Sequence, residues 1–406
     1  MEGIEMGTNI VQKQRLSFFY KMLTVIACFA SFGAWFLVQI NDDVLHVLIL
    51  FLYLVFAILC PQYYKYERKT IIWFLLLLLA ILATNIRSNF NGLLNSVFTI
   101  VPFLFVFNLK SELKSELLYA LLITLGVTMF FSMVWWMLYL IGVPLPHSYY
   151  SVGDYYEYEN YFFFIRNMKW SFLEMLPIPR YCFIFYEPGY LGCLIALLLY
   201  VYSYDFKGVK VLYILLVALI LSFSLAGWLI ALLGFIFRRL KASKNRTGWL
   251  SFFTVFMVAF VLFFKSYNGG DNIINLAVLQ RMEMSDESDA LISGYNRSSE
   301  SLRDYFWTDF VHSKHALFGR PDATRFFDND ETLVTDWFSY VIRYGWFGLA
   351  LFIFFVFYPP FAYRKNKFDL TVFSGLFLLI FSQTIFLIYG YMYLTVFSMG
   401  CNEIKE

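Results

Sequence analysis

Charged residues are scarce in this chain. Asp, Glu, Lys and Arg make up only 15% of its 406 residues, while hydrophobic residues make up 60%. So few charges cannot cover a water-facing surface of this size. The formal net charge of +2 also gives no strongly basic surface for nucleic acid. The composition excludes a soluble globular protein, and no nucleic-acid partner is expected.

Several motifs are missing as well. The five cysteines show no paired spacing, which excludes a disulfide framework and a cysteine zinc site. The sequence contains no Walker loop and no dinucleotide-binding glycine motif, so a nucleotide-fuelled reaction is not expected. It shows no internal repeat, although many transporters are built from inverted repeats. No small-residue cleavage site follows the first apolar run, so we expect an uncleaved membrane anchor.

Long apolar runs are what the chain has instead. A helix needs about 20 mostly apolar residues to cross a bilayer, and continuous runs without period-two alternation favour helices over barrel strands. We therefore expect an all-α, polytopic integral membrane protein with about 11–12 transmembrane helices in a single transmembrane domain, residues 1–406. The runs are 21–39, 44–60, 70–84, 92–107, 117–142, 188–204, 209–225, 226–238, 249–264, 336–357 and 370–389, with 390–400 as a possible twelfth crossing.

The loops between these runs form two populations of opposite charge. One alternate set, with both termini, holds 19 of the 31 Lys and Arg and 9 of the 29 Asp and Glu. The other set holds the remaining 12 basic and 20 acidic residues. Because positively charged loops stay in the cytoplasm, we expect both termini to be cytoplasmic. The two long acidic loops, 143–187 and 265–335, are then external.

The two external loops have different character. Loop 143–187 is rich in Tyr and Phe, which is typical either of a sugar-stacking platform or of an aromatic belt at the membrane interface. Loop 265–335 contains apolar residues at helical spacing near 299–316. That spacing predicts an amphipathic helix, which either lies on the membrane surface or packs on the protein core. The apolar positions are Leu302, Phe306, Phe310, Val311 and Leu317.

Glu187 stands where the first external loop meets an apolar run. Pro188 follows it, and proline is favoured at the first helical position. Glu187 is therefore expected at the helix N-cap, near the positive end of the helix dipole. Its carboxylate could remove a proton from a substrate hydroxyl. Alternatively, it is a structural cap paired with Arg180.

Arginines mark the outer compartment. If the tenth helix begins at Asp336, Arg343 lies roughly 10 Å deep, and a membrane-embedded arginine faces a wet cavity, a partner or the surface. Guanidinium groups bind phosphate through two hydrogen bonds, so a pyrophosphate site is one interpretation. Salt bridges to nearby acids are the other. The candidate arginines within the second loop are Arg297, Arg303, Arg320 and Arg325.

Two histidines could supply a base. His312 and His315 stand three residues apart on the expected helix and could also form a weak metal pair. A metal site needs more ligands than two, and the acidic run 328–331 lacks the rest of a calcium-loop pattern. We therefore expect no metal and no cofactor.

Four segments together carry a recognisable pattern: Phe185–Gly189 (FYEPG), Arg303–Trp307 (RDYFW), Ala316–Arg320 (ALFGR) and Ser339–Gly348 (SYVIRYGWFG). In kind and order they resemble motifs of the O-antigen polymerase and O-antigen ligase superfamily. Arg303 and Gly319 also have fifteen residues between them, which is similar to an arginine–glycine motif of such polymerases. The histidine that ligases carry near 333–336 is absent here, which favours the polymerase branch.

The resemblance implies a fold similar to GT-C glycosyltransferases and a location in the bacterial cytoplasmic membrane. The implied reaction transfers a glycan from undecaprenyl pyrophosphate to a sugar hydroxyl of another lipid-linked repeat unit, on the outer side. Arg180, Arg297, Arg303, Arg320 and Arg343 would bind the pyrophosphate, and Glu187, His312 or His315 would be the base. A chain-length regulator and a flippase are the partners expected besides membrane lipid. An O-antigen ligase and a polysaccharide flippase or transporter are the alternative functions.

Overall fold

The structure is a computed structural model. It describes residues 16–38, 42–65, 67–85, 102, 105–152, 156–167, 179–272, 274–275, 279, 300–320, 337–362, 367–381 and 388–403. Arg297, Arg325 and the acidic run 328–331 lie outside these described residues.

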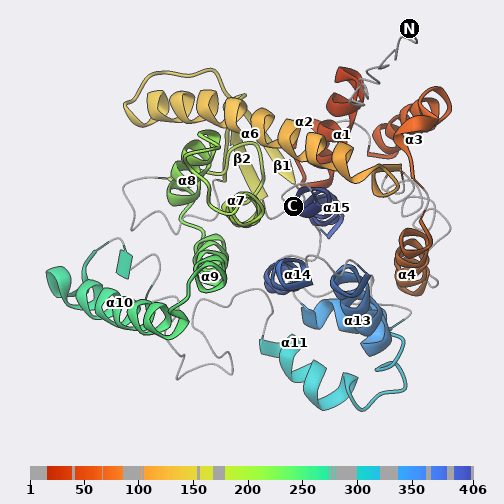
Figure 1. The fold of residues 1–406 in the computed structure, drawn as a ribbon. Helices are drawn as coiled ribbons and strands as arrows, with labels where there is room; N and C mark the ends of the chain where they lie inside the picture. The colour runs from red at the N-terminus through yellow and green to blue at the C-terminus, as the bar shows by residue number, and fades with distance from the viewer. Residues whose placement is uncertain are drawn as a thin grey trace, which may run out of the picture.

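Helices dominate the described chain, which confirms the all-α prediction (Figure 1). They are α1 Phe18–Ser31, α2 Trp35–Val38, α3 Asp42–Leu59, α4 Arg68–Asn85, α6 Ser111–Leu140, α7 Pro188–Val201, α8 Val211–Leu221, α9 Leu225–Ala242, α10 Arg246–Ser266, α11 Glu300–Tyr305, α13 Trp337–Ala362, α14 Lys367–Phe381 and α15 Ile388–Glu403. Short 3₁₀ turns, Pro61–Tyr63 and Tyr267–Gly270, follow α3 and α10.

Three segments among the described residues are long and apolar enough to cross a membrane: Ser111–Leu140, Arg246–Gly270 and Trp337–Ala362. Shorter apolar helices, Phe18–Ser31, Val44–Leu59, Pro188–Val201 and Val211–Leu221, accompany them. Since a residue adds 1.5 Å to a helix, these shorter helices are below the length of a full perpendicular crossing. The chain is a helical, membrane-embedded protein. The total of 11–12 crossings and the likeness to GT-C enzymes stay predictions.

The helices pack around a central pair, α7 and α9 (Figure 1). Gly192 of α7 and Gly227 of α9 face each other so closely that a Cβ on Gly227 would come within 2.6 Å of the Gly192 carbonyl carbon. On one side, α6 contacts α1, α8 and α15, and on the other α13 contacts α4 and α14. Nearly all of α7 is buried, so α7 is the core of the described fold.

The segment 143–187 contains an antiparallel three-stranded sheet that the sequence pattern did not predict. Strands β1 Ser148–Val152, β2 Tyr156–Asn160 and β3 Ile165–Asn167 pair in the order β1-β2-β3. Aromatic residues, which favour strands, alternate with acids in Tyr-Glu-Tyr-Glu-Asn of β2. The Ile165 N–H donates to the Phe183 carbonyl at 2.9 Å, which fixes the sheet to the segment before α7.

Contacts between segments that are far apart in the sequence stay within one of the two alternating sets of loops and adjoining helix ends. Within the basic set, Lys21 pairs with Glu116 (2.9 Å), Lys65 N–H donates to the Asn108 carbonyl (2.8 Å), and Arg238 pairs with Asp369 (2.9 Å). Within the other set, Trp35 N–H donates to Ile184 (3.1 Å), Tyr181 N–H to Leu221 (3.0 Å), and Arg166 to the Tyr139 hydroxyl (2.7 Å). These contacts fit two opposite ends of a bundle. Which end faces the cytoplasm stays a prediction.

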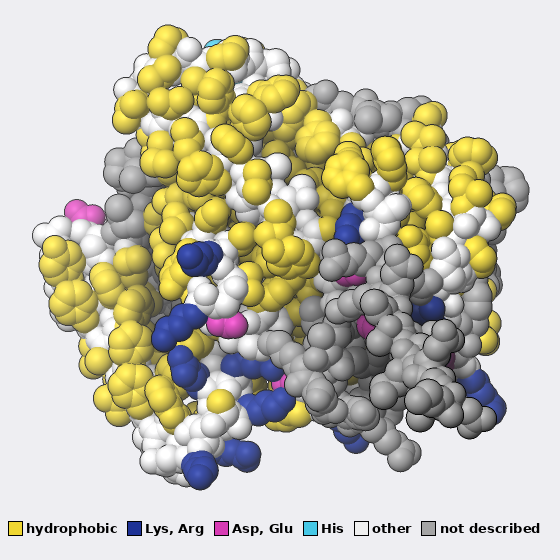
Figure 2. Space-filling view, turned by 45° about the horizontal axis from the view of Figure 1, so that its top comes forward, with side chains coloured by type: hydrophobic (Ala, Val, Ile, Leu, Met, Phe, Trp, Pro, Cys, Tyr) yellow, Lys and Arg dark blue, Asp and Glu magenta, His cyan; other side chains and the backbone are white. Residues whose placement is uncertain are grey.

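The surface fits a lipid environment. On the face drawn in Figure 2, hydrophobic side chains cover most of the surface, and Lys and Arg side chains gather in one part of it. Helix α10 is the most open of the three long apolar segments, and Phe253 is its one buried residue. Its exposed large side chains are Leu250, Phe252, Val255, Phe256, Val258, Leu262 and Phe263. Such a surface is stable in hydrocarbon and costly in water.

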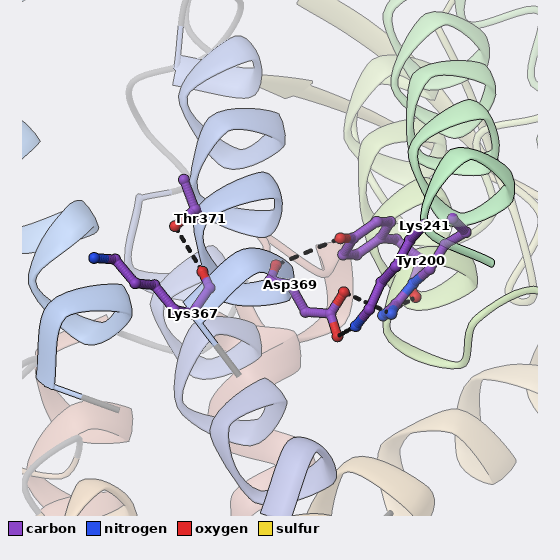
Figure 3. A network of polar contacts seen from close by, with 6 residues as sticks. Tyr200, Lys241, Lys367, Asp369 and Thr371 are labelled. Atoms are coloured by element: carbon purple, nitrogen blue, oxygen red, sulfur yellow. Dashed lines mark hydrogen bonds and ion pairs between the residues drawn. The ribbon is translucent and has the colours of Figure 1, made fainter. Parts of the chain in front are cut away.

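Asp369 joins three helices at the basic end (Figure 3). Its carboxylate accepts hydrogen bonds from Arg238 (2.9 Å) and Lys241 (2.6 Å), both on α9. Arg238 also donates to the Tyr200 carbonyl (3.1 Å) and lies 4.3 Å from the centre of the Tyr200 ring on α7. The Asp369 side chain is 8% exposed and that of Arg238 is 16% exposed, so the pair is screened little by water.

We expect Asp369→Asn to destabilise the protein by about 3 kcal/mol, because it leaves two cations, one of them mostly buried, without their carboxylate. Thermal or denaturant unfolding in detergent measures this loss. Thr371→Val is the control, since it removes a hydroxyl from the exposed face of the same helix and should cost less than about 0.5 kcal/mol. Equal stability of the two variants would contradict the role of Asp369.

Candidate functional site

The segment 300–320 packs against the first half of α13. Helix α11 continues into a π-helical turn, Phe306–Phe310, a rare geometry that is frequent at functional sites. The buried side chains of Leu302, Phe306 and Phe310 form one apolar cluster with Phe338, Val341 and Ile342 of α13. The amphipathic pattern is therefore satisfied by α13, and the helical part ends at Phe310 rather than at 316.

Helix α13 is broken at Gly345, where φ is 72° and ψ is 174°. In an intact helix, the Trp346 and Phe347 N–H groups would bond to carbonyls four residues back. Here they donate to the Ala316 and Leu317 carbonyls, at 2.9 and 3.0 Å. The Ile342 carbonyl accepts the Arg320 N–H at 2.8 Å. Residues 316–320 thus replace the lost helical partners of α13.

Glycine is required on both sides of this junction. Gly319 has φ 79°, and a Cβ there would lie 2.1 Å from the Arg343 carbonyl oxygen. A Cβ on Gly345 would lie 2.2 Å from the Leu317 carbonyl oxygen. Positive φ is costly for other residues, and these distances leave no room for a side chain. The glycines of the two late motifs are therefore explained by the backbone contact between them.

Three of the predicted arginines belong to this packed unit, which we call the arginine unit (300–320 with 337–347). Arg303 follows Leu302 on α11 and is only 9% exposed. Arg320 donates to the Tyr305 hydroxyl. Arg343 precedes the break in α13 and interacts with the Tyr344 side chain. The Nε atoms of Arg303 and Arg343 are both shielded from solvent.

Glu187 and Arg180 form a second group, near Cys182. Glu187 is the N-cap of α7, with Pro188 at the first helical position, and its side chain makes no capping hydrogen bond. Arg180 donates from Nε to the Ser222 carbonyl and from Nη2 to the Phe223 carbonyl, both at 3.1 Å. Burial raises the pKa of the Cys182 thiol to about 12, with Arg180 lowering and Glu187 raising it.

The Arg180 contacts explain its place in the fold. The carbonyls at the end of α8 have no helical donor, and a cation satisfies them well. Arg180 therefore holds the segment that leads to Glu187 against α8. The position of Glu187 at the helix N-cap is confirmed. Its partnership with Arg180 stays a prediction, and Arg180 also holds the Ser222 and Phe223 carbonyls.

The two histidines lie in the turn after the π-helix. His312 is exposed and His315 is partly buried, and the His315 carbonyl accepts the Gly319 N–H at 2.7 Å. They are not on one helical face, since the helix ends before them. Among the described residues there is no group of three or more His, Cys, Asp or Glu that could hold a metal ion.

A buried polar network in the sheet was not anticipated from the sequence. The Arg166 guanidinium donates to Glu159 (3.2 Å) and to the Tyr139 hydroxyl (2.7 Å). The Tyr161 hydroxyl donates to Glu159 at 2.9 Å. Burial, together with the bond to Glu159, raises the pKa of Tyr161, so its hydroxyl keeps its proton. The feature of the sequence that could have predicted this network is the alternation of Tyr and Glu in β2, because it places Glu159 on one face of a strand.

No protein-family model matches the chain, and neither the curated proteins nor the solved structures include one with significant similarity to it. The resemblance to O-antigen polymerases thus rests on the four motifs alone.

We expect Gly319→Ala and Gly345→Ala to open the arginine unit, because each adds a backbone clash to the strain of a positive φ. Limited proteolysis within 300–320, together with thermal unfolding, measures the effect. Gly142→Ala is the matched control: φ is 81° but the surrounding space is open, so it shows the strain alone, about 1–2 kcal/mol.

Gly375→Ala is the second control, since Gly375 has neither a positive φ nor a heavy atom within 4 Å of an added Cβ. The two junction variants should lose clearly more stability than Gly142→Ala. If Gly319→Ala behaves like Gly142→Ala, the junction does not depend on the close approach.

Proposed function

We propose that this protein polymerises lipid-linked oligosaccharide repeat units, in the manner of O-antigen polymerases, on the outer side of a bacterial cytoplasmic membrane. The observation that supports this most is the arginine unit. Three arginines of motifs that resemble the family's belong to this one packed unit, at the end of α13 that the loop charges predict to be external. The glycan produced is an O-antigen, a capsule or an exopolysaccharide.

The proposed reaction requires no cofactor. A hydroxyl of the acceptor repeat unit attacks the anomeric carbon of the donor sugar, and a new glycosidic bond forms. The bond from that carbon to the phosphate oxygen breaks, and undecaprenyl pyrophosphate leaves with the electron pair. The hydroxyl proton passes to a base on the protein, and the leaving group stays anionic.

Arg303, Arg320 and Arg343 are suited to the leaving group. A guanidinium remains charged and offers hydrogen bonds in a planar fork that matches phosphate oxygens. Partly buried donors that are fixed in place stabilise developing charge more than mobile ones do in water. The burial of Arg303, the bond from the Arg320 guanidinium to the Tyr305 hydroxyl and the backbone bond of Arg320 support such fixation.

The surroundings of the arginine unit would also suit an amphipathic substrate. A polyprenyl pyrophosphate has a charged head and a long apolar tail, so its binding site must adjoin lipid. Exposed apolar side chains stand beside the arginines: Trp307 is 54%, Leu317 53%, Phe318 52% and Phe347 43% exposed. A lipid-linked donor could place its head on the arginine unit while its tail remains in the bilayer.

We expect Arg303→Lys and Arg343→Lys to lower chain extension on the order of a hundredfold, as the loss of one fixed donor does at other anionic transition states. Lysine keeps the charge but offers no planar fork. Polymer length is measured on glycans from a deletion strain that expresses each variant at equal protein level. Arg246→Lys, an exposed residue at the predicted cytoplasmic end, is the control. Normal polymer ladders from both variants would refute the pyrophosphate role.

We expect Glu187→Gln to abolish extension if Glu187 is the base, because the amide keeps the size and cannot take a proton. Extension is measured with membranes and lipid-linked repeat units extracted from the host. His312→Ala and His315→Ala test the competing bases. An active Glu187→Gln beside an inactive histidine variant would move the base to the turn after Phe310, and Glu187 would keep only its place at the start of α7.

A further inference from the structure

The turn between β2 and β3 exposes two phenylalanine side chains. Phe162 is 68% exposed and Phe163 is 38% exposed, and their ring centres lie 4.9 Å apart. Phe162 has φ 71°, a conformation that glycine or asparagine normally takes. A large apolar residue in this strained, outward-facing position needs an explanation.

The turn is held in this shape by several hydrogen bonds. The Phe162 N–H donates to the Asn160 side-chain oxygen, the Phe163 N–H to the Tyr161 carbonyl, and the Tyr161 N–H to the Phe164 carbonyl, all at 2.9 Å. Tyr161 and Phe164 stack with ring centres 4.7 Å apart and are buried. The conformation is therefore over-determined, as strain at functional positions usually is.

Helix α6 gives the level of this turn relative to the bilayer. Glu116 is the last charged residue in α6. A rise of 1.5 Å per residue carries the helix across about 30 Å of hydrocarbon in roughly 20 residues, near Trp136. The Phe163 ring lies 5.7 Å from that of Trp135, and the Tyr161 ring 5.0 Å from that of Tyr139. The turn thus stands level with the aromatic end of α6, where Trp and Tyr meet headgroups.

The charges nearest the turn are compatible with this level. Arg166 pairs with Glu159, whose side chain is only 10% exposed. The pair neutralises itself within the sheet, so bringing the turn to the interface does not expose a lone charge to a low-dielectric medium. An apolar tip beside a satisfied ion pair is chemically matched to the boundary between headgroups and acyl chains.

We propose that the turn 161–164 is a membrane-interface anchor, which inserts Phe162 and Phe163 into the leaflet at the C-terminal end of α6. The ligand is the lipid surface itself. Lipid contact compensates the strain at Phe162, which water would not. Through the Ile165–Phe183 hydrogen bond, the anchor also fixes the segment that ends at the N-cap of α7. This proposal does not depend on the enzymatic one.

The anchor can be tested by spin-label accessibility in the full-length protein, reconstituted in phospholipid nanodiscs. Nitroxide labels are placed with Phe162→Cys, Phe163→Cys and Ser151→Cys in separate samples. Ser151 is the matched control, because it is exposed on the same sheet and pairs with Glu157, roughly 10 Å along β2 from the turn. Unsubstituted protein, labelled in parallel, gives the background from native cysteines.

The measured quantity is collision with dissolved oxygen, which concentrates in lipid, relative to collision with a water-soluble nickel chelate. We expect this ratio to be several-fold higher at 162 and 163 than at 151. Equal ratios at the three positions, or preferential collision with nickel at both 162 and 163, would overturn the anchor. Nickel-dominated collision would instead favour a water-facing aromatic surface of the kind that binds sugar rings.

Discussion

Inside a bilayer, backbone N–H and C=O groups must find partners within the protein, because hydrocarbon offers none. Most of this chain meets that requirement by being helical. Helix α13 does not meet it alone, since Gly345 interrupts its ladder. The carbonyls of Ala316 and Leu317 and the N–H of Arg320 supply the missing partners. This exchange of backbone hydrogen bonds fixes the segment 300–320 to the bundle.

The position of the arginines follows from that exchange. Arg320 and Arg343 stand on the two sides of the junction, and Arg303 lies buried on the helix that leads into it. A charged side chain near lipid is costly unless the protein surrounds it with polar groups. Here the backbone that carries Arg320 and Arg343 is held by hydrogen bonds between 316–320 and α13.

The opposite arrangement holds at the basic end. Arg238 and Lys241 share the buried carboxylate of Asp369, so these cations serve packing between α7, α9 and α14. In the sheet at the other end, Arg166 likewise pairs with a carboxylate, that of Glu159. In the arginine unit, Arg320 donates to the Tyr305 hydroxyl, and backbone hydrogen bonds join 316–320 to α13.

By itself, the sequence determined the local and periodic properties of the chain. These are a helical membrane protein, an N-cap at Glu187 before Pro188, and a helix with one apolar edge after residue 299. These depend on hydrophobic runs and on neighbouring residues. The sheet within 143–187 pairs residues that are close in sequence, and its signal was the alternation in β2. The tertiary structure alone decided the rest. The repair of the α13 break by 316–320 and the carbonyl partners of Arg180 join residues that are distant in sequence. Hydrophobic periodicity carries no information about such pairings, because it records how much surface a residue buries and not which segment buries it.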